Sequence, residues 1–512
     1  MTFDRAPYRR DALAALSGVL LVFSFPKFGH GAVAWVALGP LLLALPGAEG
    51  WTAFRLGYVT GALSALGLLY WTALVVIQYG GLSLPVGIFV MVLLCLAVAC
   101  FPALFAWLVG RWVAAYGLAG LLFAPFAWVA TEVLRAYTFF RFPWCLLGYS
   151  QHRHLPFIQI ASVTAVYGVS FLLVLSAALL AYVAKEPDPR RRRLAGAGLL
   201  LMLSLVFLIG LAVLHQPLPV DGIVRVGLVQ ANIAQDEKWN PASASANLRK
   251  HFDLASAAAD RGARLVVWPE SAVPHRFDES PELAAELRAF CRSRGLYLLF
   301  GNDDRRFEGA EGERLYVGAK MLTPAGDLAL RYHKIRLVPF GEYVPMQPLV
   351  TLGGRVAAKL VQQVSDFSPG DEAGTGLVDG RRIGAFICYE AIFPDLARLF
   401  ARDGALLLVD ITNDAWYGRT SAPYQHLAMA TFRAVENGKY LVRAANTGIT
   451  AVVDPRGRLL ESTSLFEPAL IVRDVPTVPG KTFYARYGDV FAWGCLVAAL
   501  TLTLQSGFGR HQ

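Results

Sequence analysis

Long uncharged apolar runs fill the first 215 positions of the chain, whereas the stretch from Val220 to Thr482 mixes charged, polar and apolar residues. A helix needs about 20 apolar residues to cross the hydrocarbon core of a membrane. Runs near that length, or somewhat shorter, are Ala12–Phe25, Ala32–Leu45, Leu56–Ile77, Val86–Val109, Leu118–Leu134, Phe157–Ala184, Leu194–Leu214 and Val490–Leu504. The pattern predicts a polytopic α-helical membrane bundle of about eight spans, of which the first two could instead form a re-entrant hairpin.

The composition agrees with a membrane protein, because 55% of the residues are hydrophobic and only 17% are charged. In a soluble domain, roughly a quarter of all residues are charged. We expect three parts: a transmembrane bundle of about seven spans over residues 1–215, an extramembrane domain over 220–482 and a C-terminal transmembrane helix over 488–506.

Lys and Arg residues predict the orientation, because short cytoplasmic loops retain them. One side collects Arg5, Arg9, Arg10, Arg55, Arg111, Lys185, Arg190, Arg191, Arg192, Arg193 and Arg510, while the other short loops hold mainly Lys27, Arg135, Arg141 and Arg153. Both termini are therefore predicted to be cytoplasmic and the large domain to lie outside, which in a bacterium is the periplasm. The net charge of +9 reflects this arginine clustering, so we expect no nucleic-acid partner.

The outer domain alternates strand-like and helix-like segments. Strands are expected at Ile223–Gln230, Arg264–Trp268, Leu296–Gly301, Leu315–Leu322, Ile383–Ile387, Ala405–Ile411, Leu441–Ala445 and Thr450–Val453, and helices at Ala242–Ala259, Glu282–Cys291 and around His426–Asn437. Alternation of this kind predicts an α/β sandwich.

Three motifs at strand ends concentrate the chemistry of this domain. Glu270 lies in VVWPESAVP, Lys334 in YHKIRLVPFGEYVP and Cys388 in GAFICYEAIFP. A cysteine there can act as a nucleophile, a carboxylate can take its proton and an ammonium can stabilise an oxyanion, as acyl transfer through a thioester requires. Each residue alone has a structural explanation, a core cysteine or a solvated charge, but the three together favour a catalytic site.

These motifs resemble those of the carbon-nitrogen hydrolase, or nitrilase, superfamily, and their attachment to a multispan bundle resembles its membrane branch, the apolipoprotein N-acyltransferases. The similarity includes VQANIAQDEKW, FPWCLLGYSQ, TNDAWYG and RAVENGKYLVRAANTGIT. The resemblance implies a nitrilase-like αββα domain and a catalytic triad of Glu270 as base, Lys334 as oxyanion-stabilising cation and Cys388 as nucleophile.

The activity implied by this resemblance is the transfer of a fatty acyl chain from a membrane phospholipid, through a Cys388 thioester, to the α-amine of the S-diacylglyceryl-cysteine of an apolipoprotein. The implied location is the bacterial inner membrane. We expect a monomer that uses neither a metal nor an organic cofactor, because the chain has no HExxH motif, no Cys/His cluster and no phosphate-binding glycine loop.

Other residues are weaker candidates. Glu342 and Glu390 could orient Lys334 or assist proton transfer, with surface ion pairs as the alternative. The aromatic residues Trp239, Tyr389, Trp416 and Tyr417 could line a substrate pocket, although aromatic residues belong more often to a core. Glu132 lies in an apolar run, where Arg135 is expected to be its helical partner.

Two other functions fit parts of the sequence. One is a membrane-anchored amidase or nitrilase that acts on a small external amide, although a simple anchor needs only one helix. The other is a transporter whose outer domain binds the ligand, although the apolar runs offer little polar lining for a solute path.

Overall fold

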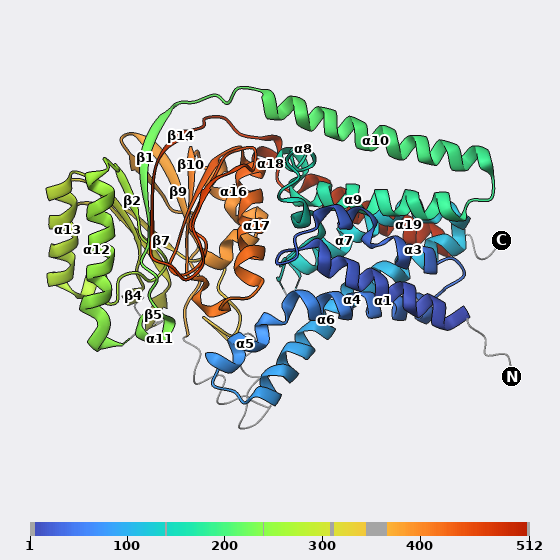
Figure 1. Ribbon diagram of the computed structural model, residues 1–512, viewed down its shortest axis with the longest axis horizontal. Helices are drawn as coiled ribbons and strands as arrows, with labels where there is room; N and C mark the ends of the chain where they lie inside the picture. Colours follow the sequence, from blue (N-terminus) through green and yellow to red (C-terminus); the bar gives the residue numbers. More distant parts are fainter. Residues whose placement is uncertain (1–5, 139–140, 239, 308–311, 345–365, 509–512) are drawn as a thin grey trace.

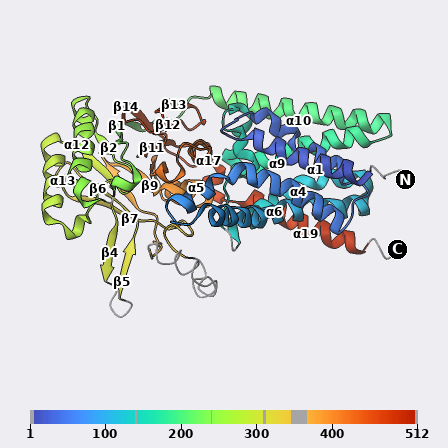
Figure 2. The ribbon, with the colours of Figure 1, turned by 60° about the horizontal axis from the view of Figure 1, so that its bottom comes forward.

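The chain folds into two bodies that lie end to end, a bundle of helices and a two-sheet α/β domain (Figures 1 and 2). The computed structural model describes residues 6–138, 141–238, 240–307, 312–344 and 366–508. Trp239 lies outside the described residues.

The long helices of the bundle lie alongside one another, with α10 along one flank (Figures 1 and 2). They are α1 (Ala6–Ser24), α4 (Trp51–Leu69), α6 (Leu84–Tyr116), α7 (Ala124–Tyr137), α9 (Ala161–Lys185), α10 (Pro189–His215) and α19 (Val490–Phe508). Shorter helices are α2 (Ala34–Ala37), α3 (Gly39–Ala44), α5 (Trp71–Gln78) and α8 (Leu155–Ile158). The predicted span Leu56–Ile77 thus divides into α4 and α5.

The bundle has the surface of a membrane protein. Leu200, Leu201 and Leu208 on α10 are each 60–69% exposed, and such leucines need lipid rather than water around them. Among the described residues, five helical segments are long and apolar enough to cross a membrane: Trp51–Leu69, Leu84–Tyr137, Ala161–Lys185, Pro189–His215 and Val490–Gly507. The count of about eight spans therefore stays a prediction.

Small residues let α4 and α6 approach closely. A Cβ atom on Gly57 would lie 2.3 Å from the carbonyl oxygen of Pro102, and one on Gly61 would lie 2.8 Å from the Cα of Ala99. These two glycines are four residues apart on one face of α4, the small-xxx-small spacing that brings membrane helices into backbone contact.

The α/β domain consists of two six-stranded sheets with helices on their outer faces. The first sheet has the order β14 (Ala469–Thr477), β1 (Gly222–Gln230), β2 (Leu265–Val267), β3 (Tyr297–Gly301), β6 (Gly318–Leu322) and β7 (Leu328–His333). The second has the order β13 (Leu459–Ser462), β12 (Ala451–Val453), β11 (Tyr440–Ala445), β10 (Leu407–Thr412), β9 (Arg381–Ile387) and β8 (Thr375–Val378). The α/β sandwich predicted from the sequence is thereby observed.

Helices α12 (Ala244–Asp260) and α13 (Pro281–Arg294) cover the first sheet, and α16 (Pro394–Arg402) and α17 (Ala422–Asn437) cover the second (Figure 1). Helix α18 (Phe483–Tyr487) lies near the bundle, whereas α11 (Gln235–Lys238) lies at the lower edge of the first sheet (Figure 1). A separate hairpin joins β4 (Asp304–Phe307) and β5 (Glu313–Tyr316). The single strand predicted at Leu315–Leu322 is wrong, because β5 ends at Tyr316 and β6 begins at Gly318 in another sheet.

Helix α17 joins the two bodies and has almost no exposed surface. Its Arg433 and Glu436 form a fully buried ion pair of 2.9 Å. Arg433 also donates to the hydroxyl of Tyr149, and Glu436 accepts a 3.0 Å bond from the N–H of Val166. That N–H follows Ala165, where α9 leaves helical geometry, so Glu436 satisfies a donor that the break exposes. The second sheet is thus anchored to the bundle through buried charges.

Candidate active site

Glu270 follows β2 and lies in a tight turn. The next residue, Ser271, has a φ of 47°, in the left-handed region. Gly301 at the end of β3 packs against this turn, where a Cβ would lie 2.4 Å from the Ser271 nitrogen and 2.7 Å from the Glu270 Cα. A residue with a side chain at 301 would push the turn away, so the glycine sets the position of Glu270, which is 6% exposed.

Lys334 follows β7 and is fully buried. Its Nζ donates to Glu270 Oε1 at 3.2 Å and to Glu342 Oε1 at 2.6 Å. Burial lowers the pKa of Lys334, but the carboxylates of Glu270 and Glu342 outweigh it and raise that pKa well above its usual value. Lys334 therefore stays an ammonium at neutral pH, so it can hold negative charge but cannot act as a base.

Cys388 follows β9 and begins the short 3-10 helix η7 (Cys388–Ile392). Its φ is 52°, an uncommon conformation for a side-chain-bearing residue. Burial raises the pKa of the thiol well above its usual value, the carboxylate of Glu270 adds to this effect, and Lys334 opposes it. The thiol lies within electrostatic reach of both charges and is neutral at rest, so a reaction at its sulfur needs a base.

Glu390 connects the cysteine turn with the lysine loop. Its Oε1 accepts from the N–H groups of Ile335 and Arg336 at 2.7 and 3.1 Å, and its Oε2 accepts from the N–H of Ile387 at 2.8 Å. The hydroxyl of Tyr332 donates to it as well, at 2.7 Å. Burial raises the pKa of Glu390 to about 7. Glu390 does not hydrogen-bond Lys334, so its contacts support a structural role in which it ties two motifs together.

Of the weaker candidates, Glu342 and Tyr417 interact with the predicted triad. Glu342 Oε1 accepts from Lys334 Nζ, and Glu342 Oε2 accepts from the N–H of Val338 at 2.9 Å. Tyr417 is 8% exposed and packs on the ring of Trp71, with 4.9 Å between centroids. The Cys388 sulfur acts electrostatically on its hydroxyl. Both residues border the site.

Tyr389 and Trp416 contact residues of the bundle. The hydroxyl of Tyr389 donates weakly to the Arg141 carbonyl at 3.4 Å, and its ring packs on Phe393. Trp416 is 37% exposed and packs on Tyr79, the residue after α5, with 4.7 Å between ring centroids. Trp416 therefore belongs to the contact between the bundle and the domain, at an edge that solvent or lipid reaches.

Two ionisable residues near the site were not singled out in the sequence. Lys238 is 6% exposed and donates to the backbone oxygen of Glu270 at 2.7 Å, and burial lowers its pKa to about 8. Burial raises the pKa of Asp303 to about 7, and Glu270 adds to the shift. Lys238 directly precedes Trp239 in VQANIAQDEKW, and that segment carries no local signal that the lysine is buried. Among the described residues, no three His, Cys, Asp or Glu side chains are placed to hold a metal ion.

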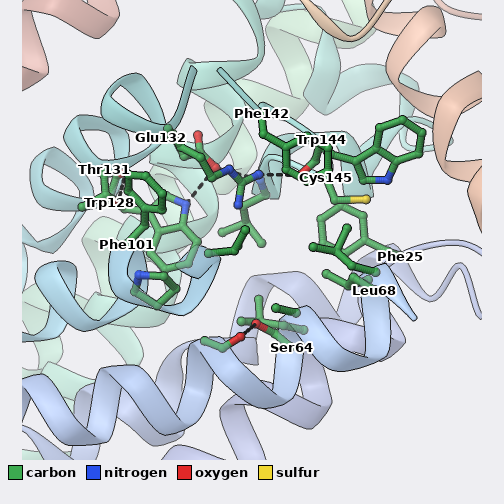
Figure 3. Close-up of a pocket in the computed structure, with 18 residues that line it drawn as sticks. Phe25, Ser64, Leu68, Phe101, Trp128, Thr131, Glu132, Phe142, Trp144 and Cys145 are labelled. Carbon is green, nitrogen blue, oxygen red and sulfur yellow. Dashed lines mark hydrogen bonds between the residues drawn. The ribbon is translucent and has the colours of Figure 1, made fainter. Parts of the chain in front are cut away.

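An apolar cavity of about 60 Å³ lies inside the bundle near this site (Figure 3). Trp144, on its wall, packs on Tyr417 and on His426 with centroids 5.7 and 5.6 Å apart. Pockets that hold drug-sized ligands measure about 300–1,000 Å³. The cavity is well below that range.

Glu132 and Arg135 line the same cavity, but their partners differ from those we expected. Glu132 accepts from the Trp128 ring N–H at 2.9 Å and from the N–H of Leu147 at 2.8 Å. Arg135 donates to the carbonyl oxygen of Trp144. Between these two described side chains no ion pair forms. They instead hold the loop after α7, because an uncompensated backbone group is costly at membrane depth.

Both bodies of the chain match known protein families. Residues 225–478 match the family model of carbon-nitrogen hydrolases, and residues 17–179 match that of the apolipoprotein N-acyltransferase N-terminal domain. A solved amidase from Nesterenkonia sp. aligns at 24% identity with a TM-score of 0.38, over 52% of this chain and 95% of its own.

Relatives match along almost the whole chain. The apolipoprotein N-acyltransferase of Geobacter metallireducens is 44% identical over 97% of this chain and 95% of its own length. That of Azotobacter vinelandii is 37% identical over 93% of this chain and 91% of its own. Identity of this extent, covering the helical and the α/β body together, shows that the chain belongs to the apolipoprotein N-acyltransferase family.

Proposed function

We propose that this protein moves a fatty acyl chain from a membrane phospholipid to the α-amine of the S-diacylglyceryl-cysteine at the N-terminus of an apolipoprotein. The observation that carries the proposal is the buried pair of Glu270 and Lys334, 3.2 Å apart, beside the Cys388 thiol. Family membership supplies the substrates, and this geometry supplies the chemistry. Glu270, Lys334 and Cys388 are the proposed catalytic residues.

In the first half-reaction, Glu270 takes the thiol proton of Cys388, and the sulfur attacks the carbonyl carbon of a phospholipid ester. The negative charge moves to the carbonyl oxygen, where the Lys334 ammonium and a backbone N–H stabilise it. The intermediate collapses, the C–O bond breaks and the leaving alkoxide takes the proton back from Glu270. The products are a lysophospholipid and a thioester on Cys388.

In the second half-reaction, the lipoprotein amine attacks the thioester carbonyl and passes a proton to Glu270. The C–S bond breaks, an amide forms and the sulfur of Cys388 regains its proton. The same base and the same cation therefore serve both steps. Burial supports this scheme, because a thioester shielded from water survives until the amine arrives.

The α/β domain is joined to a membrane bundle because both proposed substrates are anchored in a membrane. The short helix α5 lies between the bundle and the domain, and Tyr79, which follows it, donates to the Ala415 carbonyl at 3.2 Å. Trp71 of α5 packs on Tyr417, and Tyr79, just after α5, packs on Trp416. We propose that lipid acyl chains reach the thiol along this aromatic contact, with Tyr389, Glu342 and Glu390 supporting the site.

The remaining parts of the proposal concern placement. We propose about eight spans, a bacterial inner-membrane location and a periplasmic α/β domain in a protein that acts as a monomer. The distribution of Lys and Arg supports the orientation. A membrane-anchored amidase for small amides is not favoured, because the relatives that match both bodies are named as apolipoprotein N-acyltransferases.

The orientation leads to a test by reporter fusion. Alkaline phosphatase, which folds only outside the cytoplasm, should be active when joined after Gly301 and inactive when joined between Lys185 and Arg193. Enzyme activity in colonies, normalised to fusion protein level, is the measurement. The opposite pattern would place the α/β domain in the cytoplasm and remove the lipoprotein role.

The role of Lys334 leads to a kinetic prediction. Lys334→Ala should form the Cys388 acyl-enzyme at least ~100-fold more slowly in a single turnover, the loss typical of one oxyanion donor. Lys334→Arg should recover only part of the rate, because a planar guanidinium does not replace a compact ammonium at a single oxygen. Thermal unfolding and phospholipid binding are measured alongside, and near-normal acylation by a folded Lys334→Ala protein would exclude Lys334 from the mechanism.

The covalent intermediate leads to a prediction about the resting enzyme. Protein purified with phospholipid but without an acceptor should carry a fraction with one added acyl group on Cys388, because the second half-reaction needs an amine. Intact mass should detect this group, and neutral hydroxylamine, which cleaves thioesters, should remove it.

The matched variants are Cys388→Ala and Cys388→Ser. The alanine variant should show no adduct, and the serine variant at most a slowly formed, hydroxylamine-resistant ester. The five other cysteines of the chain serve as internal controls and should remain unmodified. An acyl adduct that persists in Cys388→Ala would assign the nucleophile to another residue.

A further inference from the structure

A buried cluster of four ionisable side chains contacts the backbone of Cys388. Asp410 comes from β10, His426 from α17 and Arg443 from β11, and Asp414 begins the short 3-10 helix η8 (Asp414–Tyr417). Each is at most 1% exposed. Arg443 donates to Asp414 Oδ2 at 2.9 Å and also to Asp410. None of these residues has a part in the mechanism above.

One contact links the cluster to the nucleophile. His426 Nε2 lies 3.0 Å from the carbonyl oxygen of Cys388. A carbonyl oxygen only accepts, so Nε2 must carry the proton of this hydrogen bond. On the other edge of the ring, Nδ1 lies 3.0 Å from both Asp414 Oδ1 and Arg443 Nη2. The imidazole is therefore held at both nitrogens, and its direction is set by a buried ion pair.

The bond to the carbonyl also orients an N–H group. The peptide unit between Cys388 and Tyr389 is planar and trans, so its C=O and N–H point in opposite directions. His426 thus determines which way the Tyr389 N–H points. The constraint matters here, because Cys388 has a φ of 52°, a backbone conformation that is uncommon for a residue with a Cβ.

We propose that His426 is a positioning residue that orients the Cys388–Tyr389 peptide so that the Tyr389 N–H donates to the oxyanion opposite Lys334. This inference rests on the proposed acyl transfer. In other nucleophile turns between a strand and a helix, the N–H after the nucleophile has this role. Asp414 and Arg443 act through His426 by holding its ring.

Two substitutions distinguish the hydrogen-bonding roles of the two ring nitrogens of His426. The amide nitrogen of His426→Gln can reach the Nε2 position and donate to the Cys388 carbonyl, whereas that of His426→Asn reaches only the Nδ1 position. We expect His426→Asn to slow acylation of Cys388 by about 100-fold, the effect of losing one oxyanion donor, and His426→Gln to recover most of that rate. The KM for phospholipid should stay unchanged in both.

A second reaction distinguishes positioning from general damage. Alkylation of Cys388 by iodoacetamide displaces iodide at a saturated carbon and creates no oxyanion. Its rate, followed by mass spectrometry of the Cys388 peptide, should differ little between the wild type and His426→Asn. His251→Gln, at another histidine buried in the α/β domain, controls for the loss of an interior imidazole and should leave both rates near those of the wild type.

The combined outcomes decide the proposal. Slow acylation with normal alkylation in His426→Asn, and recovery in His426→Gln, would support it. Normal acylation in His426→Asn would overturn it, and so would an equal loss of acylation and alkylation, because that result marks a structural role. If the wild-type protein itself formed no acyl-enzyme while its thiol alkylated normally, the proposed function would fail.

Discussion

The buried ammonium of Lys334 is the charge on which the rest of the site depends. Removing such a charge from water is costly unless opposite charges accompany it, and loss of one partner of a buried pair typically costs about 3–5 kcal/mol. Glu270 and Glu342 accompany Lys334 here, at 3.2 and 2.6 Å. The same cation opposes the effect that burial has on the pKa of Cys388. The ion pairs of Lys334 therefore join the Glu270 motif to the lysine motif, and the same charge acts on the Cys388 thiol.

A second layer of buried polar groups holds the reacting residues in place. Glu390 joins the loop after Lys334 to the turn that carries Cys388, and His426 binds the carbonyl of Cys388 from the other side. His426 belongs to α17, the helix that also anchors the domain to the bundle through Arg433 and Glu436. One helix, α17, thus packs the domain on the bundle and also fixes the backbone of the nucleophile. Such a link is expected of an enzyme whose two substrates are both anchored in a membrane.

Local patterns predicted much of this architecture. The apolar runs before Glu270 and Cys388 are observed as β2 and β9, because buried strands read as continuous apolar stretches. The pairing of β1 with β14, some 240 residues later in the chain, leaves no local signal. The proposed role of His426 likewise leaves no local signal, because it depends on a contact with Cys388, 38 residues away in the sequence. The strand-end motifs singled out Glu270, Lys334 and Cys388 together, and the family resemblance implied their individual roles.

The stoichiometry of transfer tests the central claim most directly. Purified protein would be mixed with phospholipid that carries isotope-labelled acyl chains and with a diacylated lipopeptide, and the products would be quantified by mass spectrometry. A thioester relay predicts one labelled amide on the lipopeptide for each lysophospholipid released, and no product when the lipopeptide amine is acetylated. Release of labelled free fatty acid without amide, at the same rate with and without lipopeptide, would instead identify a hydrolase and contradict the account.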